Sequence, residues 1–153
     1  MRSLVFYMIK RWIQRKFPTV KWLKTQQLVG WLRDRTQPQP LLLDARTEAE
    51  YQTSHLPQAQ RIDPYHPNLE EIAVDKDVPV VVYCSIGYRS ARIAQQLEQS
   101  GFTNVYNLEG SIFQWVNEGN AVFQGDRPTV QVHPYNANWG RLLKARYRAS
   151  VDS

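Results

Sequence analysis

The sequence contains a single cysteine, Cys84, among its 153 residues, and this scarcity excludes several kinds of site. One cysteine cannot form an internal disulfide, a cysteine-rich zinc site or a Cys-X-X-Cys redox pair. The three histidines are isolated from one another, and the sequence has no glycine-rich phosphate-binding loop. We therefore expect neither a metal site nor a bound cofactor. Cys84 is left as either an inert buried residue or a reactive thiol.

Long hydrophobic runs are also missing. No stretch approaches the roughly 20 consecutive apolar residues that are needed to span a bilayer. The first apolar run, Leu4 to Ile9, is shorter than the core of a signal peptide, and no small-residue cleavage site follows it. We therefore expect a cytoplasmic protein that has no transmembrane helix. An apolar fraction of 42% is typical of a folded globular protein and argues against general disorder.

Charge is distributed unevenly along the chain. Residues 1–36 carry a net charge of +8, residues 37–120 of −6 and residues 121–153 of +3. This pattern predicts a folded core at residues 25–120, with a basic extension before it (1–24) and another after it (121–153). The extensions are either solvated tails or surfaces that contact nucleic acid or a membrane, and no RNA-binding motif decides between these alternatives.

The first extension contains a short basic helix in this interpretation, and Pro18 ends it. Val5, Ile9, Trp12 and Ile13 share one face of that helix. Such a stripe can lie on a membrane surface or pack against the domain of the same chain. We predict that it packs against the domain.

Apolar strands alternate with helices through the core. Strands are predicted at 41–43, 78–83 and 104–108, and amphipathic helical patterns lie before, between and after them. Strands that are apolar throughout are typical of a parallel sheet covered on both faces. The predicted fold class is therefore α/β, with a doubly wound parallel sheet and helices on both faces. After residue 120 the pattern weakens, and only a short basic helix over 141–148 is predicted.

Cys84 directly follows the second apolar strand, where doubly wound sheets bind their ligands. The segment from Cys84 to Ser90, called the cysteine loop below, leads into the next helix. Unpaired N–H groups at a helix start and the charge of Arg89 favour a thiolate, and Gly87 can adopt the positive φ that such a turn needs. A free cysteine at the end of a strand is otherwise a small buried hydrophobe. The combination with Gly87 and Arg89 favours a reactive thiol.

Four stretches resemble single-domain rhodaneses, which are sulfurtransferases. They are Leu42–Arg46, Glu50–Ala59, Val82–Ser90 and Asn104–Gly110, and the whole resemblance runs from about residue 25 to residue 119. It implies a rhodanese-like fold and a thiol that takes a sulfane sulfur from a donor such as thiosulfate or a protein persulfide. The persulfide on Cys84 would then pass its sulfur to a thiol or to cyanide. Two serines depart from the usual glycines of the family, Ser54 before the histidine and Ser111 after Gly110.

The resemblance also implies which residues form the site. Cys84 is the catalytic residue, and the substrate-binding loop consists of Ser85, Ile86, Gly87, Tyr88, Arg89 and Ser90. We expect Ser90 to cap the following helix, with donation to the persulfide as the alternative. Arg92 is a candidate contact for an anionic donor. Asp44 and Arg46 are predicted to form a hydrogen-bonded pair that fixes the neighbouring loops.

Two other functions remain as alternatives. Cell-cycle phosphatases share this fold and also use a cysteine followed by an arginine, but with five residues between the two. Here only four residues separate Cys84 from Arg89, which predicts a smaller loop that suits one sulfur atom. The third hypothesis is an interaction module without enzymatic activity, and the intact cysteine argues against it.

Overall fold

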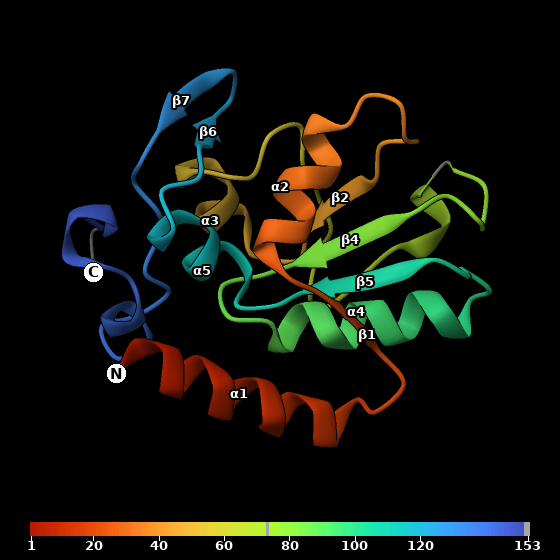
Figure 1. The fold of residues 1–153 in the computed structure, drawn as a ribbon, viewed down its shortest axis with the longest axis horizontal. Coiled ribbons are helices and arrows are strands. Elements are labelled where there is room, and N and C mark those ends of the chain that lie inside the picture. The colour runs from red at the N-terminus through yellow and green to blue at the C-terminus, as the bar shows by residue number, and fades with distance from the viewer. Residues whose placement is uncertain (73, 152–153) are drawn as a thin grey trace.

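A five-stranded parallel sheet forms the centre of the structure, a computed structural model that describes residues 1–72 and 74–151 (Figure 1). The strands in spatial order are β1 (Lys21–Leu23), β5 (Val105–Leu108), β4 (Val80–Tyr83), β2 (Leu41–Asp44) and β3 (Gln60–Arg61). Each strand runs parallel to its neighbours. The predicted α/β class and the three predicted strands are confirmed.

Helices cover both faces of this sheet. Figure 1 shows α1 (Arg2–Lys16) and α4 (Tyr88–Gln99) on one side, and α2 (Thr25–Arg33), α3 (Glu48–Thr53) and α5 (Ser111–Asn117) on the other. The central strand β4 shows why two covered faces are needed. Its Val80 and Val82 are buried in the cluster that includes α4, whereas Val81 and Tyr83 are buried in the cluster that includes α5. Successive strand side chains point to opposite faces, so an uninterrupted apolar strand requires cover on each side.

The sheet includes a strand from the predicted N-terminal extension. In β1, Lys21 is paired with Tyr106 of β5 and Leu23 with Leu108, so this segment forms one edge of the sheet. The three-part division of the chain remains a prediction. However, the sheet itself extends four residues further toward the N-terminus than the predicted core.

Helix α1 ends two residues before Pro18, as predicted, and packs along the domain. Ile13 is fully buried, and Val5 and Ile9 are partly buried against the core. The predicted packing of the apolar stripe is therefore confirmed for these three residues. Trp12 differs, because its side chain is half exposed and stacks on Tyr88 with ring centroids 5.1 Å apart.

The C-terminal segment also packs on the domain. It forms a hairpin of β6 (Val122–Gln124) and β7 (Arg127–Thr129), followed by two short 3-10 turns, η2 (Trp139–Leu142) and η3 (Ala145–Tyr147); a third such turn, η1 (Leu69–Glu71), precedes β4. The predicted helix over 141–148 is wrong. Leu143 and Lys144 are extended between the turns, because Asn117 of α5 donates to the carbonyl of Leu142 and accepts from the N–H of Lys144. Those hydrogen bonds replace helical ones.

Within the residues that the structure describes, no helix has the length and apolar character needed to cross a membrane.

The burial of Ile13 leads to a first prediction. Ile13→Ala should lower the free energy of unfolding by about 3 kcal/mol, since it deletes buried methyl groups and leaves a cavity. Urea denaturation followed by circular dichroism measures this value. Met8→Ala on the exposed side of α1 is the matched control and should change stability by less than about 0.5 kcal/mol. Equal effects of the two substitutions would contradict the packing of α1 on the domain.

Candidate active site

Cys84 lies at the carboxyl end of β4, at the base of a pocket, and its side chain is almost completely buried. The cysteine loop turns back over the sulfur, so that the backbone N–H of Gly87 donates to Cys84 Sγ at 3.1 Å. The hydroxyl of Ser90 lies 3.4 Å from the same sulfur. The Gly87 N–H therefore points at the atom that would carry negative charge in a thiolate or a persulfide, and the Ser90 hydroxyl lies beside that atom.

Gly87 is the residue that makes this turn possible. It is the N-cap of α4 and has a φ of 116°, a conformation that side chains disfavour. A Cβ at this position would lie 3.6 Å from Ile13 Cδ1 and 3.7 Å from Asn107 Nδ2, so α1 and β5 both pack closely behind the loop. The predicted positive φ is confirmed.

Buried polar side chains hold the loop from behind. Asn107 of β5 accepts from Ser90 Oγ at 2.6 Å and donates through Nδ2 to the carbonyl of Gly87 at 3.0 Å. Ser111 Oγ accepts from the N–H of Cys84 at 3.2 Å and donates to the carbonyl of Leu108. Ser90 is therefore not the helix cap that we expected. Its hydroxyl donates to Asn107 and its oxygen lies beside the sulfur, because the side chain points into the site from the first turn of α4.

Arg89 is held by a carboxylate from α3. Its guanidinium donates to both carboxylate oxygens of Glu50, at 2.8 and 2.9 Å, and also to Ser85 Oγ at 3.0 Å. Ser85 in turn donates to Glu50, which closes a three-residue network across α3 and the cysteine loop. Burial raises the pKa of Glu50, but the hydrogen bonds and charge of Arg89 outweigh it and lower the pKa to about 2. The positive charge that we expected beside the thiol is therefore largely balanced by Glu50.

Asp44 and Arg46 form the predicted buried pair. The guanidinium donates to both carboxylate oxygens, at 2.8 and 2.7 Å, and to the carbonyl of Ser54 at 2.6 Å. The hydroxyl of Tyr83 donates to Asp44 at 2.7 Å and accepts from the N–H of Leu56. Burial and the charge of Asp44 hold the pKa of Tyr83 well above its usual value, so this hydroxyl stays protonated. The network ties the end of β2 to the loop that follows α3.

A pocket of about 290 Å³ opens above the sulfur. Half of the residues that line it are aromatic, and they come from four separate parts of the chain: Trp12, Tyr65, Tyr88, Tyr135 and Trp139. The others are Cys84, Ser85, Ile86, Arg89 and Arg92. Both predicted extensions therefore contribute walls to the site.

Arg92 lies at this pocket, as a contact for an anionic donor requires, and its Nη2 atom donates to the carbonyl of Pro64 at 2.7 Å. Its role in binding a donor remains a prediction. Among the residues that the structure describes, no three His, Cys, Asp or Glu side chains are grouped so that they could hold a metal ion.

Three residues of the site were missed by sequence reasoning. Glu50 was named only as the first residue of a stretch that resembles rhodaneses, although the Thr47-X-X-Glu50 capping box could have drawn attention to it. Asn107 carried a signal, because it is a polar residue inside an otherwise apolar buried strand. Ser111 was noticed only as a departure from a family glycine, and it has a φ of 50°.

A parallel sheet covered by helices, with a buried thiol at a strand end and a loop that aims a backbone N–H at the sulfur, defines a class of α/β proteins with a candidate reactive cysteine. The model of the family described as "Rhodanese-like domain" matches residues 28–118, more than half of the chain. The chain therefore belongs to the rhodanese-like family.

Several known proteins are similar to this chain. A sulfurtransferase from Allochromatium vinosum is 35% identical over 79 residues, which cover 52% of this chain and 74% of that protein. A tRNA uridine(34) hydroxylase from Sodalis glossinidius is 36% identical over 84 residues, but they make up only 24% of the hydroxylase. The chain thus spans about a quarter of the hydroxylase.

Solved structures agree in fold. The crystal structure of a rhodanese-related protein from Thermoplasma volcanium has a TM-score of 0.59 and 23% identity, covering 68% of this chain and 98% of that one. A rhodanese-like domain protein from Staphylococcus aureus has a TM-score of 0.55 and 26% identity, covering 63% and 91%. Both structures support the rhodanese-like fold of this chain.

The low pKa of Glu50 leads to a second prediction. Because this pKa lies near 2 instead of the usual 4.5, the ionised carboxylate stabilises the fold fully above pH 4.5, and that stabilisation is lost as the pH falls toward 2. Glu50→Gln should therefore lower the free energy of unfolding by roughly 3 kcal/mol at pH 7 and by roughly 1 kcal/mol at pH 3. Urea denaturation at both pH values measures the difference.

Glu48→Gln is the matched control for this prediction. It changes an exposed carboxylate of the same helix, which pairs with Arg61 at the surface, and should have little effect at either pH. If Glu50→Gln lowered the free energy of unfolding by the same amount at pH 7 and at pH 3, the ion pair with Arg89 would not stabilise the fold.

Proposed function

We propose that this protein is a sulfurtransferase that carries a sulfane sulfur as a persulfide on Cys84. The observation on which this proposal rests is the backbone N–H of Gly87, which donates to the sulfur at 3.1 Å, with the Ser90 oxygen 3.4 Å from the same atom. A backbone donor held in this way stabilises a negative charge without needing to move when the charge forms. A cysteine that served only for packing would not need such a donor.

The proposed reaction has two steps, shown here for thiosulfate. The Cys84 thiolate attacks the outer sulfur of thiosulfate, the sulfur–sulfur bond of the donor breaks, and sulfite leaves with the electron pair. A thiolate or cyanide then attacks the outer sulfur of the persulfide, and the Cys84 thiolate is regenerated. The chain has no second cysteine, so the acceptor must come from outside it. A protein persulfide is the alternative donor.

The two arginines have different roles in this proposal. Arg89 is bound through both terminal nitrogens to Glu50, so we assign it to the support of the cysteine loop. Arg92 has one terminal nitrogen on the carbonyl of Pro64 and lies at the pocket, so it is the residue that we assign to an anionic donor. The thiol is only 1% exposed, and the donor must therefore reach it through the pocket.

The same contacts argue against the phosphatase alternative. A phosphoryl group offers three oxygens that need several donors at once. Here the loop has four residues between Cys84 and Arg89, and Glu50 already occupies the edge of the Arg89 guanidinium that would donate to two of those oxygens.

The third prediction tests the persulfide. Wild-type protein treated with thiosulfate should gain one sulfur atom on the peptide that contains Cys84, as measured by mass spectrometry, because the thiolate accepts the outer sulfur of the donor. Cys84→Ser should gain none and should lose thiosulfate-to-cyanide transfer, while circular dichroism shows a native fold. Transfer by this variant at more than about a tenth of the wild-type rate would rule out Cys84 as the nucleophile.

The fourth prediction separates sulfur transfer from phosphate chemistry. Wild-type protein should hydrolyse p-nitrophenyl phosphate no faster than Cys84→Ser, because the short loop and the pairing of Arg89 leave too few donors for a phosphoryl group. Release of p-nitrophenol, followed by its absorbance, is the measurement. Hydrolysis that depends on Cys84 would favour the phosphatase alternative.

A further inference from the structure

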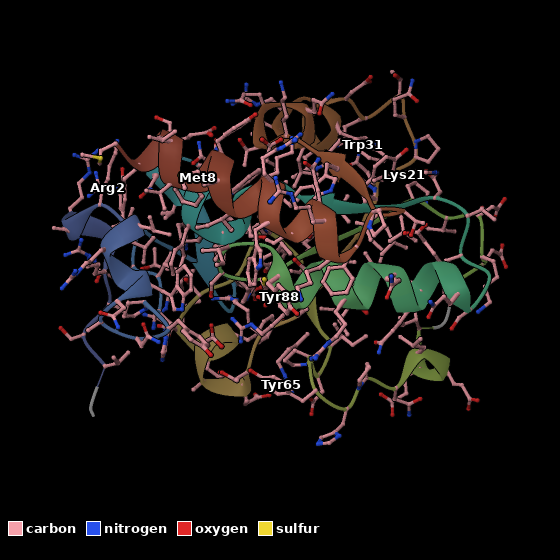
Figure 2. All side chains as sticks on the ribbon, turned by 90° about the horizontal axis from the view of Figure 1, so that it is seen from below. Arg2, Met8, Lys21, Trp31, Tyr65 and Tyr88 are labelled. Atoms are coloured by element: carbon pink, nitrogen blue, oxygen red, sulfur yellow. The ribbon has the colours of Figure 1, made fainter. Side chains whose placement is uncertain are left out.

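Helix α1 has a second apolar side that faces away from the domain. Val5, Ile9 and Ile13 pack on the core, but Leu4, Tyr7 and Met8 are each about 60% exposed. Trp12 continues this side at 47% exposed. Figure 2 views the protein from the side on which α1 lies, with Met8 labelled on the helix. Packing on the domain explains the apolar residues on one side of α1, but it does not explain the large apolar residues on the exposed side.

This second side also carries charge of one sign. Arg11 and Arg15 are exposed and fall between the apolar residues at helical spacing, and Lys16 is exposed beside them. The helix contains no acidic residue, and in the whole sequence none precedes Asp34. We call this side the α1 outer face, and its members are Leu4, Tyr7, Met8, Arg11, Trp12 and Arg15.

We propose that the α1 outer face docks this protein on the surface of a bilayer that contains anionic phospholipids. Exposed aliphatic and aromatic side chains can enter the boundary between headgroups and acyl chains, with the helix lying in the plane of the surface. The long arginine side chains between them can extend to the phosphate groups while their stems stay in the apolar layer. A bilayer with anionic headgroups would therefore bind both the apolar and the basic side chains of this face.

Two other occupants fit the outer face less well. Nucleic acid would be bound by the arginines and stacked by Tyr7 or Trp12, but the aliphatic side chains of Leu4 and Met8 would gain nothing from phosphates or bases. A second copy of the chain would bring the arginines of two outer faces together with no acidic residue on either helix to pair with them. Such like-charge contacts are unfavourable.

The position of Trp12 connects the docking surface to the active site. This side chain belongs to the α1 outer face and also lines the pocket above Cys84. Tyr65, Tyr135 and Trp139 of the same pocket are exposed as well. A bilayer that contacts the outer face would therefore lie close to the mouth of the pocket, and substrates would reach the thiol from the membrane side. The docking inference itself does not depend on the proposed sulfur transfer.

The test is co-sedimentation of the full chain with two kinds of vesicle, one of phosphatidylcholine alone and one of phosphatidylcholine mixed with phosphatidylglycerol. Binding should be at least 10-fold tighter to the mixed vesicles and should weaken as salt is added, because the arginines attract anionic headgroups. Leu4→Glu and Met8→Glu should each weaken this binding about 10-fold or more, since they place a carboxylate in the apolar layer.

Val130→Glu is the matched control. It introduces the same charge at another exposed apolar residue, directly after β7, and should leave binding unchanged. Figure 1 shows β7 on the opposite side of the molecule from α1. Circular dichroism should show a native fold for all three variants, since each changed side chain is exposed.

Several outcomes would overturn the proposal. They are the absence of binding to the mixed vesicles, equal binding to both kinds of vesicle, and equal binding by Met8→Glu and wild type. Light scattering that shows a dimer dissociated by Met8→Glu, without vesicle binding, would assign the outer face to a second copy. Binding of single-stranded RNA that Met8→Glu abolishes, again without vesicle binding, would assign it to nucleic acid.

Discussion

The backbone conformation of Gly87 is the constraint on which the rest of the site depends. A positive φ at the junction of β4 and α4 aims the Gly87 N–H at the sulfur of Cys84, and any side chain at this position would be strained. The surroundings keep this turn in place: Asn107 holds its carbonyl, and Ile13 packs against the position where a Cβ would be. A preorganised donor of this kind acts without reorganisation when charge develops on the sulfur.

Two buried ion pairs lie around this turn, and each one connects a different pair of structural elements. The pair of Asp44 and Arg46 joins β2 to the loop after α3, whereas the pair of Glu50 and Arg89 joins α3 to the cysteine loop. Both pairs are bidentate and shielded from water, so each fixes an orientation as well as a distance. The hydrogen bond that reaches the sulfur therefore comes from a neutral donor, the amide of Gly87.

Segments before and after the central domain also contribute residues to the site. Trp12 stacks on Tyr88 of the cysteine loop, and the guanidinium of Arg89 lies 4.9 Å from the ring of Tyr135. The pocket thereby acquires aromatic walls from segments before and after the region that matches the rhodanese-like family. The same packing leaves the α1 outer face exposed, and Trp12 belongs both to this face and to the wall of the pocket.

Short-range patterns in the sequence were sufficient to predict the parallel sheet and the place of the thiol. Four consecutive apolar residues in β4 require cover on both faces, and a cysteine directly after such a strand must lie at its carboxyl end. The partner of Arg89 could not be predicted in this way, because Glu50 lies 39 residues away and no periodicity encodes which side chains meet across two loops. For the same reason only the tertiary structure decided that Trp12 and Trp139 share one pocket, since their positions depend on how both ends of the chain fold back over the sheet.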